Sequence, residues 1–141
     1  MNDDIRKEVE ELRVKSVEAF KKEDYINTIY ILEKAWDILP GNKIDEKESF
    51  TIASYILEAA IRSKNKKVME KWIEKIVDAN PARPDCGERE MWIGKVHYEL
   101  GNFDKAKEYL SIAYQKSGGR SFTSRDMVYK HFLEERMSSF N

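Results

Sequence analysis

The chain has 141 residues, of which 41% are hydrophobic and 36% charged, and 25 basic against 26 acidic residues give a formal net charge of −1. This composition is typical of a single helical domain with charged outer faces and excludes a disordered chain. The balanced charge argues against nucleic-acid binding, which depends on clustered Lys and Arg that neutralise phosphates. A local basic patch remains around Arg62, Lys64, Lys66 and Lys67.

The chain carries no pattern for membrane insertion or secretion. No apolar run approaches the ~18 residues that cross a bilayer, and the start, Met1-Asn2-Asp3-Asp4, is acidic where a signal peptide is basic. The single cysteine, Cys86, is expected to be a loop thiol without an internal disulfide, which fits a reducing compartment. We therefore expect a cytoplasmic protein with no membrane contact.

Apolar periodicity predicts four helices in the first part of the chain. The first runs from Asp3 to Lys21, and the second follows Asp24, a suitable N-cap, and ends before Pro40-Gly41. The third is expected from Asp45 to Ser63 and the fourth from Lys66 to Ala79. The short connections predict that neighbouring helices pair as hairpins.

Three further helices are predicted after the second proline-rich loop. The fifth, Glu88 to Leu100, and the sixth, Phe103 to Lys116, are separated by Gly101-Asn102, where glycine can close a helix in the left-handed conformation. A turn at Gly118-Gly119-Arg120 precedes a capping box of Thr123 and Asp126. The last helix carries an apolar stripe made of Val128, Tyr129, Phe132 and Leu133. The chain is therefore expected to be all-α, with about seven antiparallel helices.

The second helix of each predicted hairpin repeats one pattern. From its first residue, apolar or small residues follow seven and ten positions later; the three sets are Tyr25, Leu32, Ala35; Lys66, Ile73, Ile76; and Phe103, Leu110, Ala113. Pro40 and Pro81 lie 41 residues apart, as do Tyr25 and Lys66, and the next step is 37 residues. Two independent markers therefore give one period.

The third copy spells Gly94-x-x-His97-Tyr98-Glu99-Leu100-Gly101-Asn102-Phe103-Asp104-Lys105-Ala106, followed by Leu110 and Ala113, and resembles the tetratricopeptide repeat (TPR) family. The resemblance implies a single domain over 1–141, with repeats near 9–42, 50–83 and 87–119 and a capping helix near 124–138, in a right-handed superhelical stack. The chain departs from the family pattern where the first-helix tryptophan is expected, at Leu12, Ala53 and Glu90, and at Ser16 and Leu57, which replace its glycine.

In this family a concave wall, built from the first helix of each repeat, binds a protein or peptide. The resemblance assigns partner binding to Arg13, Val17, Ser54, Tyr55, Glu58, Met91, Trp92 and Lys95. Tyr55 and Trp92 occupy equivalent positions, so we expect them side by side as aromatic anchors; the alternative is that either packs under a neighbouring helix. Trp36 and Trp72, on second helices, are expected to be packing residues.

No motif for catalysis, cofactor binding or metal binding is found. The two histidines, His97 and His131, have no metal-ligand partner at helical spacing, and His97 is expected to be a packed, hydrogen-bonded core residue. Gly118-Gly119-Arg120-Ser121 lacks the lysine and the spacing of a P-loop. The acidic residues interleave with lysines, as solvated helix faces do. We expect a protein that is not an enzyme.

The matching positions of the co-chaperone clamp for Glu-Glu-Val-Asp tails hold Arg13, Val17, Tyr55, Glu88 and Trp92, so that role is not expected. A narrower resemblance, to small bacterial TPR proteins that act as immunity partners of toxins, rests on three stretches: Ala35-Trp36-Asp37-Ile38-Leu39-Pro40, Gly87 to Val96, and Ser117-Gly118-Gly119-Arg120. It implies steric neutralisation of a cognate toxin domain. The alternatives are a general TPR adaptor or scaffold for a peptide, and a nucleic-acid-binding helical repeat.

Overall fold

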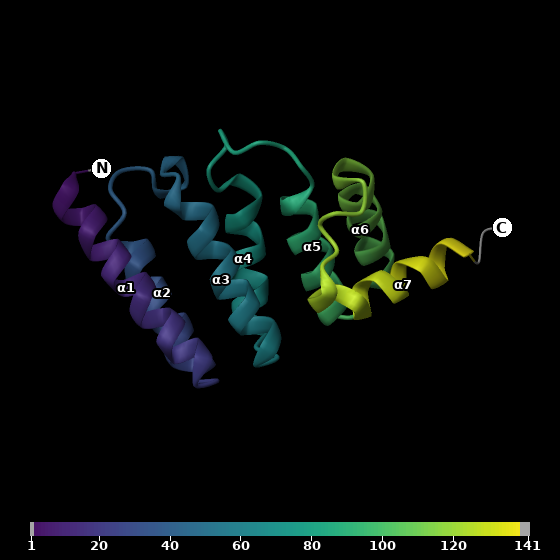
Figure 1. Ribbon diagram of the computed structural model, residues 1–141, viewed down its shortest axis with the longest axis horizontal. Helices are drawn as coiled ribbons and strands as arrows, with labels where there is room; N and C mark the ends of the chain where they lie inside the picture. The colour runs from purple at the N-terminus through teal and green to yellow at the C-terminus, as the bar shows by residue number, and fades with distance from the viewer. Residues whose placement is uncertain (1, 139–141) are drawn as a thin grey trace. The chain divides into compact units, whose positions relative to one another are not determined.

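The computed structural model describes residues 2–138, and Met1 and residues 139–141 lie outside this part. The described chain is all-helical and has no β-strand (Figure 1), which confirms the all-α prediction. Its elements are α1 (Asp3–Lys21), α2 (Tyr25–Asp37), the 3-10 helix η1 (Lys43–Asp45), α3 (Glu48–Arg62), α4 (Lys66–Asp78), α5 (Glu88–Glu99), α6 (Phe103–Ser117), the 3-10 helix η2 (Ser124–Asp126) and α7 (Met127–Ser138).

The chain divides into two compact units, residues 1–83 and residues 84–141. In the first unit α1 packs against α2, α2 against α3, and α3 against α4. In the second unit α5 packs against α6, and α7 contacts α6. Within each unit the paired helices run antiparallel, as their short connections require (Figure 1). The prediction of one domain over 1–141 stays a prediction.

The three hairpins close with the same turn. The residues Glu23, Lys64 and Gly101 have φ angles of 60°, 55° and 82°. The next residue donates its N–H to the carbonyl five residues back in each case: Asp24 to Ala19 at 3.0 Å, Asn65 to Ala60 at 2.9 Å, and Asn102 to His97 at 2.8 Å. This is the Schellman ending of a helix. The predicted breaks are therefore confirmed as three copies of one turn.

The residue after each left-handed position is the N-cap of the second helix of the hairpin. Asp24 and Asn65 are N-caps whose side chains accept hydrogen bonds from Asn27 N and Val68 N, both at 3.2 Å, and this confirms the predicted role of Asp24. Such caps satisfy N–H groups that have no partner inside the helix. The helices begin at Tyr25, Lys66 and Phe103, the residues that set the sequence register.

Burial follows that register. The residues three and ten positions into each second helix are buried in all three hairpins: Thr28 and Ala35, Met69 and Ile76, Ala106 and Ala113. On the first helices, Ser16, Leu57 and Gly94 occupy equivalent positions and are all buried. The same offsets therefore face the interior of each hairpin, which is the structural counterpart of the repeated sequence pattern.

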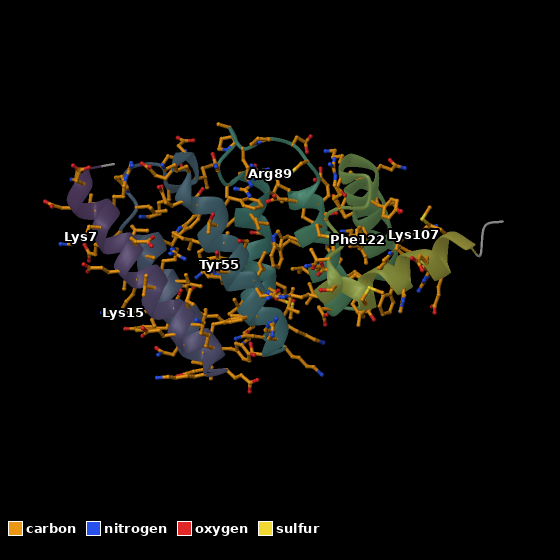
Figure 2. All side chains as sticks on the ribbon, viewed as in Figure 1. Lys7, Lys15, Tyr55, Arg89, Lys107 and Phe122 are labelled. Carbon is orange, nitrogen blue, oxygen red and sulfur yellow. The ribbon has the colours of Figure 1, made fainter. Side chains whose placement is uncertain are left out.

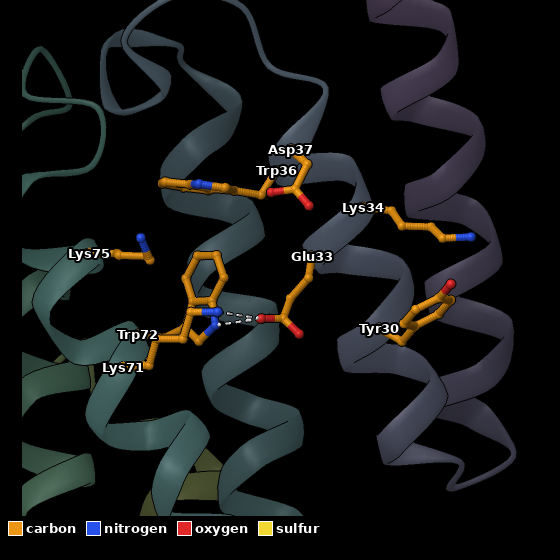
Figure 3. A pocket seen from close by; sticks show the side chains of 8 residues that line it. All are labelled: Tyr30, Glu33, Lys34, Trp36, Asp37, Lys71, Trp72 and Lys75. Atoms are coloured by element: carbon orange, nitrogen blue, oxygen red, sulfur yellow. Dashed lines mark hydrogen bonds and ion pairs between the residues drawn. The ribbon is translucent and has the colours of Figure 1, made fainter.

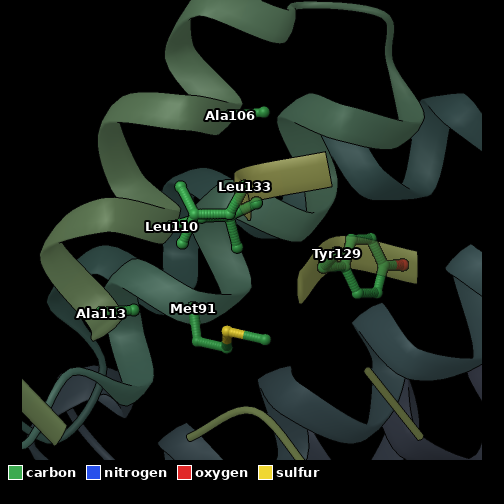
Figure 4. Close-up of a cluster of buried hydrophobic side chains, with 6 residues drawn as sticks. All are labelled: Met91, Ala106, Leu110, Ala113, Tyr129 and Leu133. Atoms are coloured by element: carbon green, nitrogen blue, oxygen red, sulfur yellow. The ribbon is translucent and has the colours of Figure 1, made fainter. Parts of the chain in front are cut away.

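The core of the second unit joins α5, α6 and α7 (Figure 4). Its buried members are Met91, Ala106, Leu110, Ala113, Tyr129 and Leu133. Tyr129 Oη also donates to Glu99 Oε1 at 2.8 Å, which ties α7 to the end of α5. The predicted capping box is present, because Thr123 and Asp126 exchange hydrogen bonds at the start of η2. The last helix thus covers an apolar face of its own unit.

The third helix starts later than predicted. Residues 43–45 form η1, Glu46 is extended with ψ 138°, and α3 begins only at Glu48. The Ser49 hydroxyl donates to Ile44 O at 3.2 Å, and Asn80 N donates to the same carbonyl at 2.7 Å. The predicted start at Asp45 is therefore wrong, since a contact with a distant loop fixes this segment outside the helix.

Among the described residues, no helix is both long and apolar enough to cross a membrane.

Candidate functional site

Five of the predicted partner-binding residues lie on the first helices of the first unit. Arg13 and Val17 come from α1, and Ser54, Tyr55 and Glu58 from α3. Tyr55 is 41% exposed, although nine other residues of its helix are buried. Figure 2 labels Tyr55 on α3. We name the exposed Tyr55 and the half-buried Arg13, Val17 and Glu58 the first-helix surface.

Ion pairs order the charged residues of the first-helix surface. Arg13 donates to both carboxylate oxygens of Glu10, at 2.9 and 2.6 Å, and these bonds, assisted by Tyr55, raise the pKa of the Arg13 guanidinium. Glu58 accepts from Arg62 at 3.3 Å. Arg13 and Glu58 are half-buried and carry opposite charges. The surface around Tyr55 therefore combines an aromatic ring with one basic and one acidic group.

Arg62 lies beside the first-helix surface and joins α3 to α1. Its guanidinium carbon lies 4.9 Å from the centre of the Phe20 ring. Burial opposes the charged form, but hydrogen bonds with Tyr25 and Glu58 outweigh it and raise the pKa of Arg62. Arg62 therefore stays charged and positions Glu58 beside Tyr55.

Ser54, also predicted to bind the partner, is 8% exposed, and its hydroxyl donates to Thr51 O at 2.8 Å. In the second unit Met91 is 4% exposed and belongs to the hydrophobic core. Both side chains face the protein interior. Their assignment to partner binding stays a prediction that the observed burial does not favour.

Trp92 and Lys95 lie one turn apart on α5. The Trp92 ring is half-buried, and the Lys95 ammonium lies 4.7 Å from its centre, a cation–π distance. The same ammonium forms an ion pair of 2.6 Å with Asp126, whose side chain is 7% exposed. These interactions hold Lys95 within its own unit. Trp92 is therefore the most accessible of the three residues of this unit that were predicted to bind a partner.

Asp126 has a role that the sequence did not predict, as the partner of Lys95. One carboxylate oxygen pairs with Lys95, and the other accepts from Thr123 N and Thr123 Oγ1, both at 2.9 Å. Burial acts to raise the pKa of the Asp126 carboxyl, but the Lys95 and Thr123 donors outweigh it and hold that pKa below its ordinary value. The capping box was visible in the sequence, whereas its bond to Lys95, 31 residues away, left no local signal.

His97 is a half-buried residue, stacked on Tyr109 with ring centres 6.1 Å apart. Its Nδ1 lies 3.2 Å from Asn102 Nδ2, so the predicted packing and hydrogen bond are present, but the ring is half-buried and does not belong to the core as predicted. Burial, with the Lys105 charge, lowers the pKa of the His97 imidazole. Within residues 2–138 no group of three or more His, Cys, Asp and Glu side chains is arranged to hold a metal ion.

Comparisons of the chain with protein-family models, with curated proteins and with solved structures gave no match. The resemblance to the TPR family therefore rests on the repeated offsets and on the three matching turns. Tyr55 belongs to the first unit and Trp92 to the second, so their expected neighbourhood stays a prediction.

Proposed function

We propose that the protein is a non-enzymatic protein-binding module of the TPR type. In this proposal the hairpins stack into a right-handed superhelix, and the first helices line its concave side. Support comes from three hairpins that share one turn, one register and one pattern of burial. Repeats of this kind bury their apolar faces against one another and use the exposed wall for binding.

The observation that carries the proposal is the exposure of Tyr55 on the most buried helix of its unit. A tyrosine supplies a large apolar area with a polar end and loses little side-chain entropy on binding, so exposed aromatic residues are frequent binding anchors. Arg13 and Glu58 flank it with opposite charges. This surface suits a protein partner with both apolar and charged groups.

Toxin neutralisation is the particular role we favour. A protein that blocks a toxin by covering its active site needs complementary shape and charge but no catalytic group of its own. The mixed first-helix surface meets this requirement. The proposed partner is thus a folded toxin domain, and the mechanism is steric exclusion of substrate in the cytoplasm of the producing cell.

Site-specific photo-crosslinking tests the proposal. A photoreactive phenylalanine analogue is placed at Tyr55, or as a control at Val128, a 58% exposed residue of α7. We expect one protein to be captured in producing cells from position 55 and not from position 128. Crosslinking at neither position, or equally at both, contradicts the proposed surface.

The alternatives give different results with the captured species. A toxin domain should lose its activity when mixed with an equimolar amount of the purified protein. A short segment that binds as well as the whole partner would favour a peptide adaptor, and capture that disappears after nuclease treatment would favour a nucleic-acid-binding repeat.

A further inference from the structure

A second candidate site lies on the opposite helices of the first unit. A pocket of about 310 Å³ opens between α2 and α4 (Figure 3). Its lining residues are Tyr30, Glu33, Lys34, Trp36, Asp37, Lys71, Trp72 and Lys75. We name it the α2–α4 pocket. None of these residues belongs to the first-helix surface.

Two indole rings form the floor of the α2–α4 pocket. Trp36 and Trp72 meet edge to face, with ring centres 5.0 Å apart and planes at 90°. Both are buried, so their expected role in packing is confirmed. Tyr30 at the rim is 57% exposed, and the Lys34 ammonium lies 4.5 Å from its ring centre. The floor is rigid and apolar, and the rim offers an accessible aromatic ring.

The two α4 lysines at the pocket have different partners. Lys71 Nζ lies 3.0 Å from Glu33 Oε2, and the same oxygen accepts from Trp72 Nε1 at 3.3 Å, as the dashed lines in Figure 3 mark. Lys75 Nζ lies 5.6 and 5.4 Å from the ring centres of Trp36 and Trp72. Among the described residues, no carboxylate lies within ion-pair distance of Lys75. Lys75 thus presents a cation held against indoles without an acidic partner.

The lysines of the pocket favour an anionic ligand over a cationic one. The position that an aromatic pair offers to a cation is already filled by Lys75, and Lys34 adds a second positive charge, whereas the charge of Lys71 is paired with Glu33. An incoming cation would meet repulsion. A carboxylate would instead gain an ion pair with Lys75 next to a low-dielectric floor, where such a pair is strengthened.

The surroundings of the pocket favour a carboxylate over a phosphate chain. Glu70 and Glu74 flank Lys71 on the exposed side of α4, and Asp37 lines the pocket. These acids would repel the closely spaced charges of a nucleic acid, whereas an isolated carboxylate beside an apolar side chain can reach Lys75. We propose that the α2–α4 pocket binds an acidic segment of a protein, with a Glu or Asp carboxylate on Lys75 and an apolar neighbour on Tyr30.

The inference does not depend on the first-helix surface and has its own readout. The indole N–H groups of Trp36, Trp72 and Trp92 give three NMR signals, of which two belong to the pocket. The probe is the acetylated, amidated pentapeptide Leu-Ser-Glu-Leu-Ser, which carries one carboxylate beside apolar side chains, and its control is the same peptide with Gln in place of Glu. We expect the acidic peptide to shift the Trp36 and Trp72 signals while the Trp92 signal stays in place.

Two variants of α4 test whether Lys75 binds the carboxylate of the peptide. Lys75→Met should lower the affinity for the acidic peptide about tenfold or more, which is the usual contribution of a hydrogen bond between charged groups. Lys67→Met, which removes an exposed lysine of α4 outside the pocket, should leave its affinity unchanged. If thermal melting shows that Lys75→Met has lost its fold, Lys75→Gln replaces it.

Four results would overturn the inference. These are the absence of any shift of the Trp36 and Trp72 signals, equal shifts with the uncharged peptide, equal shifts with inorganic phosphate at the same ionic strength, and undiminished binding by the folded Lys75 variant. Because a Tyr55 crosslink does not enter this experiment, failure here leaves the first-helix proposal standing, and the converse also holds.

Discussion

Gly94 of α5 and Leu110 of α6 approach so closely that a β-carbon on Gly94 would lie 2.7 Å from Leu110 Cγ and 3.0 Å from the Leu110 backbone nitrogen. These separations are shorter than van der Waals contact. The absence of a side chain at Gly94 therefore allows α5 and α6 to pack closely. In the other hairpins the equivalent positions are Ser16 and Leu57.

Gly94→Ala should therefore destabilise the protein. Overpacking costs about 1–3 kcal/mol, and the better helix propensity of alanine returns about 1 kcal/mol, so a net loss is expected in the free energy of unfolding from urea titrations. Leu110→Ala, at a fully buried residue, should cost about 2–5 kcal/mol. In the Leu110→Ala background Gly94→Ala should cost less, because the contact with the Leu110 side chain is removed and only the approach to the backbone nitrogen remains. Additive costs would contradict the proposed contact.

The ion pair between Lys95 and Asp126 should be worth far more than an exposed one. Lys95→Met leaves a buried carboxylate without its cation and should lower the free energy of unfolding by about 3 kcal/mol. The matched control, Arg13→Met, breaks the exposed pair with Glu10 and should cost below about 1 kcal/mol. Adding Asp126→Asn to Lys95→Met should restore part of the loss. Equal costs for the two single variants would show that the buried pair is not formed.

Stability should fall on acidification in two steps. His97 has a lowered pKa in the folded state, so the unfolded chain takes up its proton first, and stability declines as the pH drops below the ordinary value of 6.5. Asp126 also has a lowered pKa, so its contribution is present above the ordinary value of 3.8 and is lost as the pH falls through the folded-state pKa. Thermal melting between pH 7 and about pH 2 measures both steps.

One variant identifies the source of the upper step. His97→Gln should reduce the loss of stability between pH 7 and pH 5. An unchanged upper step in His97→Gln would exclude His97 as its source.

The shared turn predicts that glycine improves the second hairpin. Lys64 has a positive φ of 55°, a conformation that costs a side-chain-bearing residue about 1 kcal/mol or more, and Gly101 occupies the equivalent place in the third hairpin. Lys64→Gly should therefore raise the free energy of unfolding by about 0.5–1 kcal/mol. Glu70→Gly, at an exposed position inside α4, should lower it by about 1 kcal/mol. A loss of stability with Lys64→Gly would contradict the left-handed turn.

The sequence predicted the helices and the turns well because both are set by neighbouring residues. A left-handed position, a capping side chain and a 3.6-residue apolar period all act within a few residues. The start of α3 was mispredicted because Ile44 O accepts a hydrogen bond from Asn80, 36 positions further along the chain. No local pattern encodes such a contact.

The same dependence on distant contacts explains why the candidate site was only partly predicted. Register identifies the face of a helix but not what packs on it: Met91 lies in a core completed by Tyr129 and Leu133 of α7, and Lys95 is held by Asp126. Lys75 was likewise indistinguishable from the other lysines of α4, since its position over the two indoles depends on the packing of α2 against the hairpin formed by α3 and α4. For Tyr55 the register left two alternatives, an exposed anchor and a packed residue, and its 41% exposure favours the first.

The most direct test of the proposed function is calorimetric titration of the protein captured at position 55 into four forms of the chain. Tyr55→Ala and Trp92→Ala should each weaken binding at least about thirtyfold, the effect of losing a central aromatic anchor, with helical circular dichroism unchanged. Tyr114→Ala, which removes a 43% exposed tyrosine of α6, should bind like the unaltered chain. Full affinity in Tyr55→Ala, together with a loss in Tyr114→Ala, would contradict binding through the first helices.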